Sequence, residues 1–189
     1  MFGFDLDNTL IDYSASVRRY SLTFLETKFE NISQLRKFFK EQNQRIEWQK
    51  AQSWLYTEGL EYAELSAGAA DLFWRLNKNS IPFCVISHKT MRTPKDFGHL
   101  DLRKPAIHWI QEKLEPNTIA PVAVHFEVTR QKKLKRIKEL EVTHFIDDLI
   151  EVLQDSEFPR NVSKILYDPF EVIVNQTSNI QIINRFDQL

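Results

Sequence analysis

The sequence predicts an α/β protein: a Rossmann-like parallel sheet with helices on both faces and a small α-helical cap insert. Short apolar runs of strand length alternate with segments of helical periodicity, which is typical of parallel sheets. The run FCVI, residues 83–86, is apolar without alternation, as expected for a strand buried on both faces. Residues 14–66 break the alternation. We therefore expect a core of residues 1–13 and 67–189 around a helical insert of residues 14–66.

Five runs are predicted strands, because each is apolar and of about strand length. They are FGFDL (2–6), IPFCVIS (81–87), VAVHFEV (122–128), THFID (143–147) and SKILY (163–167). Three segments between them space their apolar residues along one face of a helix. The predicted faces are Ala69, Leu72, Phe73 and Leu76 in residues 67–79, Ile107, Ile110 and Leu114 in residues 102–114, and Leu134, Ile137 and Leu140 in residues 130–140.

The insert of residues 14–66 is predicted to form two or three helices, and it is longer than a simple crossover needs. Its aromatic residues are expected to form the core of the insert rather than ligand contacts. Because the insert follows the first strand, it must emerge at the carboxyl end of that strand. A lid there could exclude water and contact the part of a substrate remote from the reacting atoms.

Composition excludes several classes of protein. With 189 residues, 42% hydrophobic and 27% charged, the chain has the composition of a folded globular protein. A net charge of −1 argues against a nucleic-acid binder that relies on bulk electrostatics. No apolar stretch approaches the roughly 18 residues of a membrane span, and no signal peptide is recognisable. The single cysteine, Cys84, lies in an apolar run and predicts a buried thiol in a reducing compartment, so we expect a cytoplasmic protein.

Polar residues gather at the ends of the predicted strands. Asp5 and Asp7 follow the first strand, Ser87 ends the second, and Asp147 and Asp148 end the fourth. Because the carboxyl ends of parallel strands lie at one edge of the sheet, these side chains are expected to converge. Each taken alone has an ordinary structural explanation, such as a helix cap or a turn. Their joint occurrence favours a functional site.

The spacing of Asp5 and Asp7 indicates the kind of chemistry. Residues two apart in a strand point the same way, so both carboxylates would face one direction. Two negative charges at so short a distance repel each other, which costs free energy unless a cation lies between them or one of them holds a proton. The set suits phosphoryl transfer, in which one carboxylate attacks phosphorus and the second gives a proton to the leaving oxygen. A hard cation such as Mg²⁺ would take carboxylate and phosphate oxygens.

The sequence resembles the haloacid dehalogenase (HAD) superfamily over residues 2–151. The first motif of that superfamily is Asp-x-Asp-x-Thr followed by an apolar residue, and DLDNTL at residues 5–10 matches it. Ser87 matches the Ser or Thr that ends an apolar strand, a basic helix can supply the lysine of the third motif, and IDDL matches the acidic fourth motif. Asn8 stands where many members have Gly, and Ile146 replaces the usual Gly of the fourth motif.

The resemblance implies catalytic and metal-binding roles. Asp5 would be the nucleophile and Asp7 the general acid and base. Mg²⁺ would be held by Asp5, by the backbone carbonyl of Asp7 and by Asp147, with Asp148 close by. The catalytic lysine is expected to be Lys133, which lies at the margin of the apolar face of its helix, with Lys132 as the alternative. Ser87 would bind phosphate, and the further candidates for substrate contact are His88, Lys89 and Asn8.

An aspartate at position 7 favours hydrolysis of a phosphate ester, because an alkoxide leaving group needs a proton. We therefore predict a phosphoric monoester hydrolase with Mg²⁺ as cofactor and a small phosphorylated metabolite, such as a sugar phosphate, as substrate. One alternative is a polynucleotide-end phosphatase, which would need a basic or aromatic groove. The other is a non-catalytic binding or regulatory module with this fold, against which the presence of every expected catalytic residue type argues.

Overall fold

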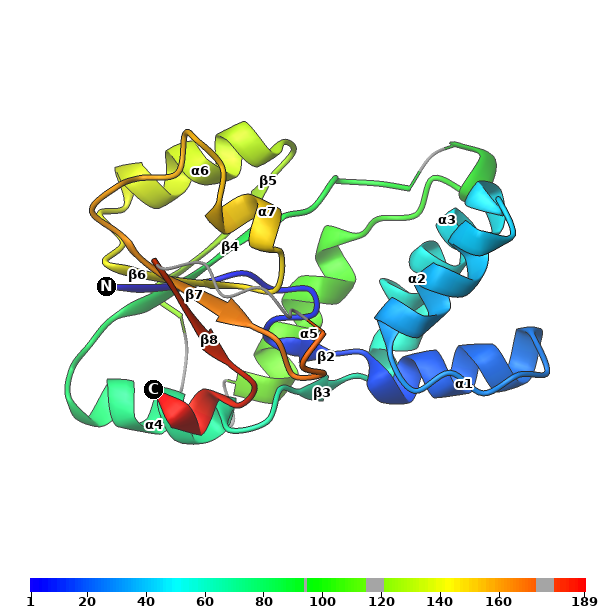
Figure 1. The fold of residues 1–189 in the computed structure, drawn as a ribbon, viewed down its shortest axis with the longest axis horizontal. Helices are drawn as coiled ribbons and strands as arrows, with labels where there is room; N and C mark the ends of the chain where they lie inside the picture. The colour runs from blue at the N-terminus through cyan, green and yellow to red at the C-terminus, as the bar shows by residue number, and fades with distance from the viewer. Residues whose placement is uncertain (94, 115–120, 173–178) are drawn as a thin grey trace. The chain divides into compact units, whose positions relative to one another are not determined.

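The structure of the chain is a computed structural model, which describes residues 1–93, 95–114, 121–172 and 179–189 (Figure 1). The strands are β1 (Phe2–Phe4), β2 (Ile11–Asp12), β3 (Glu64–Leu65), β4 (Phe83–His88), β5 (Ala123–Glu127), β6 (His144–Asp147), β7 (Ser163–Tyr167) and β8 (Ile180–Ile183). The α-helices are α1 (Ser14–Phe24), α2 (Ile32–Glu41), α3 (Arg45–Leu55), α4 (Ala69–Lys78), α5 (Arg103–Leu114), α6 (Arg130–Glu139) and α7 (Ile150–Leu153). Short 3₁₀-helices are η1 (Glu58–Tyr62), η2 (Lys95–Phe97) and η4 (Phe186–Gln188).

Six strands form one sheet in the order β5-β4-β1-β6-β7-β8, and every neighbouring pair is parallel. Strand β1 lies inside the sheet, where Gly3 is in register with Cys84 of β4 on one side and with Phe145 of β6 on the other. The carboxyl ends of these three strands are therefore neighbours. The predicted α/β fold with a Rossmann-like parallel sheet is confirmed.

The sheet is buried on both faces, and alternate residues of β4 contribute to different cores. Cys84 and Ile86 pack with residues of α6, whereas the ring of Phe83 stacks on Phe73 of α4 with the ring centroids 4.5 Å apart. Figure 1 shows α6 and α4 on opposite sides of the sheet. Two buried faces explain why the run FCVI is apolar throughout, because neither face of the strand meets water.

Strand β1 is shorter than predicted, and the strands β2, β3 and β8 are not among the five predicted ones. Strand β1 ends at Phe4 instead of Leu6, because the chain enters a turn at Leu6. The carbonyl of Leu6 accepts from the backbone N–H groups of both Leu10 and Ile11. Strand β8 is not predicted by the sequence. It forms one edge of the sheet, and among its residues only Ile183 is fully buried, so its short run IQII lacks the continuous apolar character of the inner strands.

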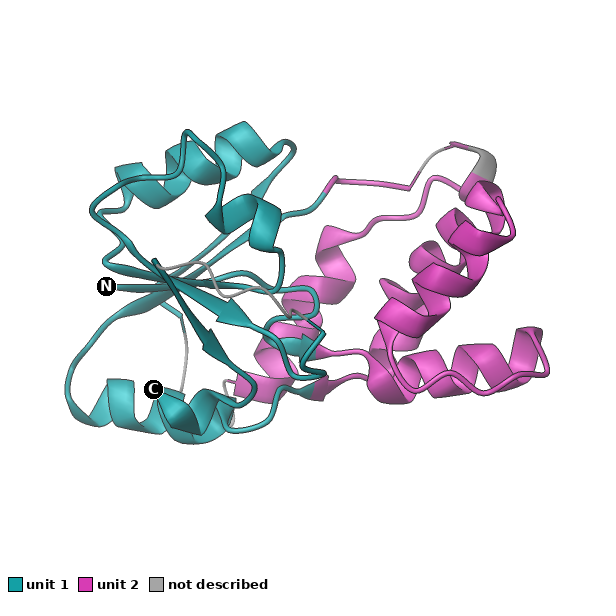
Figure 2. Cartoon of the chain, viewed as in Figure 1, with its two compact units in different colours: residues 1–11, 65–89, 116–189 teal, residues 12–64, 90–115 magenta. Residues whose placement is uncertain are grey.

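The chain divides into two compact units (Figure 2). We call Met1–Ile11, Leu65–Lys89 and Pro116–Leu189 the core unit, and Asp12–Glu64 and Thr90–Glu115 the helical unit. The helical unit thus contains α5, whereas the predicted insert stopped at residue 66. Packing explains the difference: the buried Trp109 of α5 donates from Nε1 to the carbonyl of Ala63 at 3.2 Å, and Ile107, expected to be buried, is exposed.

The first segment of the helical unit contains three α-helices, α1, α2 and α3, followed by the 3₁₀-helix η1. The side chain of Asn31 caps α2 by accepting from the backbone N–H of Gln34 at 3.0 Å. Asn43, with φ of 54°, adopts a left-handed conformation between α2 and α3. A left-handed residue ends an α-helix, so α2 and α3 are separate helices.

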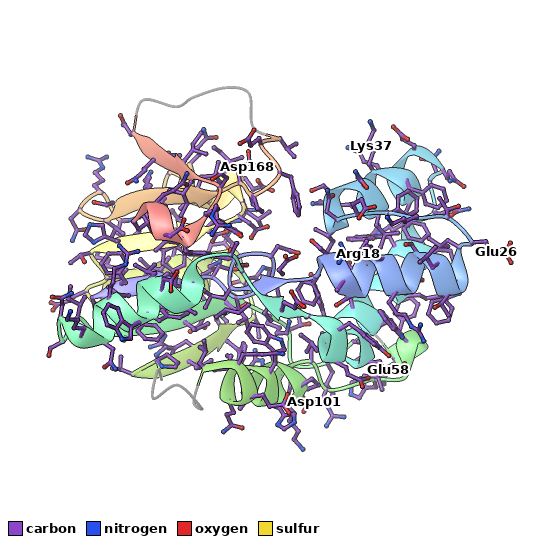
Figure 3. All side chains as sticks on the ribbon, turned by 90° about the horizontal axis from the view of Figure 1, so that it is seen from below. Arg18, Glu26, Lys37, Glu58, Asp101 and Asp168 are labelled. Carbon is purple, nitrogen blue, oxygen red and sulfur yellow. The ribbon has the colours of Figure 1, made fainter. Side chains whose placement is uncertain are left out.

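Charged side chains project from the helical unit, and several of them are labelled in Figure 3. Arg18 of α1 lies 3.5 Å from Glu30, and Lys37 of α2 lies 3.8 Å from Glu41. All four side chains are exposed, so these pairs contribute little to stability. Across the described parts of the chain, no helix combines the length and apolar character that a membrane crossing requires.

Candidate active site

Three neighbouring strands carry acidic or hydroxyl residues to one edge of the sheet. Asp5 follows β1 directly, and its backbone N–H donates to the carbonyl of Ile146 in β6 at 2.9 Å, which extends the pairing of β1 by one residue. Asp147 is the last residue of β6, and Ser87 is the last but one of β4. All three side chains are buried. The carboxyl ends of the parallel strands thus provide a protected polar site, as expected for this kind of sheet.

Lys133 of α6 joins two of these carboxylates. Its Nζ lies 2.5 Å from Oδ1 of Asp5 and 2.6 Å from Oδ2 of Asp147, and the three side chains are at most 8% exposed. The hydroxyl of Thr129 caps α6 by accepting from the backbone N–H of Lys132 at 3.2 Å. In the first turn that follows, Lys133 points into the protein while Lys132 is exposed. Of the two candidate lysines, Lys133 is the one that contacts Asp5.

A glycine in β1 makes room for the apolar wall beside Lys133. The ring of Phe145 has its centroid 5.3 Å from Nζ of Lys133. A Cβ on Gly3 would come within 2.8 Å of Phe145 Cδ2, closer than real Cβ atoms approach other atoms. Glycine inside a strand normally weakens the strand. At this position it allows the ring of Phe145 to pack directly against the backbone of β1.

Burial and neighbouring charges shift the pKa values of the site in opposite directions. It raises the pKa of Asp5 to about 7, because the loss of hydration outweighs the attraction of Lys133. Burial, reinforced by repulsion from Asp147 and Asp5, also raises the pKa of Asp148 well above its ordinary value. Burial alone would lower the pKa of Lys133, but the attraction of Asp147 and Asp5 exceeds that effect and raises it. The ammonium of Lys133 thus contacts two carboxyl groups, those of Asp5 and Asp147, and also attracts the charge of a third, that of Asp148.

The three carboxyl groups fit a divalent cation. Asp5, Asp147 and Asp148 each offer a carboxylate oxygen, and these oxygens lie within 4.8 Å of one another. Oxygen ligands suit hard cations such as Mg²⁺, and a dication would balance the acidic groups that Lys133 leaves uncompensated. Among the described residues, the carboxylate of Asp7 is not part of this group. Its predicted share in a metal site would come from its backbone carbonyl.

Asp7 lies in the turn after β1 and has a lysine partner of its own. Nζ of Lys89 lies 2.8 Å from Oδ1 and 2.6 Å from Oδ2 of Asp7. Asn8 follows with φ of 62°, a left-handed conformation that asparagine tolerates better than most residues. The expectation that Asp5 and Asp7 share one face of a strand is therefore wrong in detail. The strand ends before Asp5, and each aspartate is held by a different lysine.

The end of β4 keeps the alternation of a strand. Ser87 and Lys89 are buried, whereas His88 between them is exposed and its Nε2 lies 3.2 Å from the carbonyl oxygen of Val128. The substrate-binding roles expected for Ser87, His88, Lys89 and Asn8 stay predictions. The two-residue period explains why Lys89, placed just beyond the strand, is on the same side as Ser87.

Thr9 is a site residue to which the sequence analysis gave no role. Its Oγ1 accepts from the backbone N–H of Asp148 at 3.0 Å and lies 3.3 Å from Oδ1 of the same residue. The side chain of Thr9 is fully buried. It thus fixes the loop after β6 to the turn after β1. The signal was available, because Thr9 is the threonine of the first motif, but 139 residues separate it from its partner.

Comparisons with known proteins concern the fold of the chain. No protein-family model and no curated protein matches the sequence. Among solved structures, a HAD hydrolase of family IA, variant 3, from Entamoeba histolytica is similar with a TM-score of 0.58 and 16% identity, covering 100% of this chain and 94% of that one. A predicted phosphatase from Clostridium acetobutylicum has a TM-score of 0.52 and 17% identity, covering 88% and 83%.

A third similar structure carries a ligand. It is a CbbY mutant from Rhodobacter sphaeroides in complex with xylulose-1,5-bisphosphate, with a TM-score of 0.58 and 13% identity, covering 100% of this chain and 95% of that one. At such identities a likeness shows the fold alone. The chain therefore has the fold of the HAD-superfamily hydrolases, and the resemblance predicted from its motifs is confirmed at that level.

Proposed function

We propose that the chain is a Mg²⁺-dependent phosphatase that hydrolyses a small phosphomonoester through an aspartyl-phosphate on Asp5. The observation that carries the proposal is the buried cluster of Asp5, Lys133 and Asp147, with Asp148 beside it, at the carboxyl edge of a parallel sheet. A nucleophilic carboxylate, a cation that steadies it and an acidic cation site are what phosphoryl transfer requires.

The chain's own residues supply each covalent and proton-transfer step. A carboxylate oxygen of Asp5 attacks phosphorus, and the bond between phosphorus and the ester oxygen breaks while Asp7 gives that oxygen a proton. Asp7 then takes a proton from water as the water oxygen attacks phosphorus. The bond to Asp5 breaks, phosphate leaves and both aspartates return to their starting states. Lys133 holds Asp5 in place and Ser87 donates to a phosphate oxygen throughout.

Mg²⁺ would be held by carboxylate oxygens of Asp5 and Asp147 and by the backbone carbonyl of Asp7, with Asp148 close by. When bound, it would offset the negative charge that gathers where the phosphate group approaches these aspartates.

A small phosphorylated metabolite is the proposed substrate class, with a sugar phosphate favoured. The support is the similar CbbY structure, which holds a sugar bisphosphate. We propose further that the helical unit selects the substrate as a cap. Chain connectivity supports this: the two segments of the helical unit begin at Asp12 and Thr90, directly after the turn that contains Asp7 and after Lys89. A cytoplasmic location is in keeping with the buried free thiol of Cys84.

The test is a phosphatase assay of the purified chain with 4-nitrophenyl phosphate, a panel of sugar phosphates and a 3′-phosphorylated oligonucleotide, each with Mg²⁺ and with a chelator. We expect Mg²⁺-dependent turnover, fastest on a small phosphate. Asp5→Asn should lower turnover by several orders of magnitude without unfolding the protein, while Asp71→Asn, the same change at an exposed aspartate, should have little effect. Full activity in Asp5→Asn would refute the proposal, and the oligonucleotide as best substrate would favour a polynucleotide-end phosphatase.

A further inference from the structure

The ion pair between Lys89 and Asp7 differs from an ordinary surface pair in its burial and in its geometry. A single ammonium group contacts both oxygens of one carboxylate, at 2.8 and 2.6 Å. The side chain of Lys89 is 2% exposed and that of Asp7 is 13% exposed. Contact with both oxygens restrains rotation of the carboxylate about its last bond as well as its position.

The sheet fixes the place of the Lys89 ammonium. The backbone N–H of Lys89 donates to the carbonyl of Glu127 at 3.0 Å, next to the pair His88 and Glu127 in the register of β4 and β5. The backbone of Lys89 is thus tied to the sheet one residue beyond β4. Because its side chain is also buried, the long stem has few alternative conformations, and the ammonium is a fixed point at the edge of the sheet.

Asp7, in contrast, lies on a turn and not on a strand. The backbone N–H groups of Leu10 and Ile11 close the turn on Leu6, and Asn8 is left-handed. The pleat of a sheet does not orient a side chain in such a turn. A general acid must nevertheless lie within hydrogen-bond reach of the leaving oxygen, because proton transfer loses efficiency quickly with misplacement.

We propose that Lys89 is a positioning residue that holds the Asp7 carboxyl group at the place from which it exchanges protons with the leaving oxygen and with water. This inference rests on the proposed function, in which Asp7 is the general acid and base. Lys89 itself gives up no proton. Its contacts with both oxygens set the plane and the position of the Asp7 carboxyl group.

The proposal differs from direct binding of the substrate phosphate by Lys89, and the leaving group distinguishes the two. Protonation matters for an alkoxide and hardly at all for a nitrophenolate. The measured quantity is kcat/KM, which reports the steps up to departure of the leaving group. Loss of a phosphate contact would lower kcat/KM for both substrates alike, whereas a misplaced acid would lower it only for the alkyl phosphate.

The experiment compares Lys89→Met, Asp7→Asn and the double variant on an alkyl phosphate and on 4-nitrophenyl phosphate. We expect Lys89→Met to lose about 100-fold in kcat/KM on the alkyl phosphate and less than about 5-fold on the nitrophenyl ester, since general acids contribute that order of acceleration. The double variant should have the same kcat/KM as Asp7→Asn, because a residue that positions the general acid has no effect once that acid has been removed. Lys89→Arg should recover part of the loss.

Further variants distinguish a positioning role of Lys89 from a role in folding, and a failure of this inference from a failure of the proposed function. Lys138→Met removes an exposed lysine of α6 and should leave kcat/KM unchanged for both substrates. If Lys89→Met fails to fold, Lys89→Gln, which can still donate a hydrogen bond, takes its place in the same comparison. Equal losses on both esters, or additive losses in the double variant, would overturn the inference while Asp5→Asn still abolishes activity. Activity that survives Asp5→Asn would overturn the proposed function and the inference with it.

Discussion

Lys133 and Lys89 lie at the same edge of the sheet, but they bind carboxylates in different ways. Lys133 contacts one oxygen of Asp5 and one of Asp147, which belong to the ends of two neighbouring strands. Lys89 contacts both oxygens of Asp7, which lies on a turn. The first lysine links two carboxylates to each other, and the second orients a single one.

The difference predicts different consequences when each lysine is lost. Without Lys133, two buried carboxylates would face each other with no cation between them. Breaking a buried ion pair in this way costs about 3–5 kcal/mol of stability. Without Lys89, the single carboxylate of Asp7, which is 13% exposed, would keep partial contact with water, so this loss should cost less stability than the loss of the cation between two buried carboxylates. A residue that stabilises a charge cluster should therefore affect folding and catalysis together, and a positioning residue mainly catalysis.

The largest effect is expected for Lys133→Met. Turnover should fall about 10²- to 10³-fold, the usual cost of removing one electrostatic partner of the reacting group, and the melting temperature should fall further than in Lys89→Met. Steady-state kinetics and thermal unfolding measure the two effects. The matched control is Lys132→Met, because Lys132 is the neighbouring residue and is exposed. This variant should lose much less turnover and much less thermal stability. Should Lys133→Met not fold, Lys133→Arg, which keeps the charge, replaces it.

Three results would break the comparison between the two lysines. One is a larger loss of turnover in Lys132→Met than in Lys133→Met, which would assign the catalytic role to Lys132. Another is equal destabilisation by Lys133→Met and Lys89→Met, because it would mean that both ion pairs serve mainly to fold the protein. The third is full turnover in a folded Lys133→Met protein, because Asp5 would then need no cation from α6.

A smaller effect is expected for Thr9→Val, which keeps the shape of the buried side chain but removes its hydroxyl. The backbone N–H of Asp148 would lose its acceptor, and the loop after β6 would be free to shift. Residues that support metal ligands in this way are commonly worth about 10- to 100-fold in metal affinity. Titration calorimetry with Mg²⁺ measures the change, and unaltered affinity in Thr9→Val would show that Asp148 is held without Thr9.

The raised pKa of Asp5 predicts that Mg²⁺ binding depends on pH. With a pKa of about 7 in the metal-free protein, Asp5 must lose a proton before it can bind a cation at lower pH. The ionised fraction rises from about 0.1 at pH 6 to about 0.9 at pH 8, so apparent affinity should increase about tenfold over that range. The sign is fixed, because protons compete with the cation for Asp5.

Calorimetry in buffers of different ionisation enthalpy checks this directly. Asp5 should release close to one proton per Mg²⁺ bound at pH 6, and about 0.1 at pH 8. Asp5→Asn should remove this share and leave only the protons that come from Asp148, whose pKa is also raised. An affinity that is constant between pH 6 and pH 8 would mean that Asp5 is ionised throughout, and that Lys133 offsets the effect of burial more completely than the raised pKa implies.

The parts of this molecule that follow a regular period could be predicted from the sequence. The inner strands are apolar because both of their faces are covered, and the buried face of α6 predicts that Lys133 and not Lys132 points into the protein. That Asp5 and Asp147 lie close together could be predicted because the carboxyl ends of parallel strands meet at one edge of the sheet. Each inference needs only local periodicity and the rule for where such strands end.

The remaining features depend on contacts that no local period determines. The pairing of Lys89 with Asp7 joins residues 82 apart, and the partner of a turn residue is not set by strand geometry. The inclusion of α5 in the helical unit depends on what Trp109 packs against, which its own helix does not reveal. Strand β8 has too few buried residues to stand out from a loop.

The smallest effect concerns substrate selection by the helical unit. A cavity of about 300 Å³ lies between α2 and α3, with Phe39 and Trp48 in its lining. Arg36, Lys40 and Arg45 also line it, and within the described residues no carboxylate pairs with these three cations. Lys37 in the same helix, labelled in Figure 3, is paired with Glu41 and does not line the cavity.

If the helical unit selects an anionic metabolite, we expect the three cations of this cavity to take part in the selection. Arg36→Gln and Arg45→Gln should each lower kcat/KM for the preferred sugar phosphate by about 3- to 10-fold, the usual effect of one exposed charge on association, and leave 4-nitrophenyl phosphate nearly unchanged. Lys37→Gln is the matched control and should alter neither. The quantity to report is the ratio of kcat/KM for the two substrates, because it cancels losses of active enzyme. An unchanged ratio in both arginine variants would remove this cavity from the specificity determinants and leave selection to other surfaces of the helical unit.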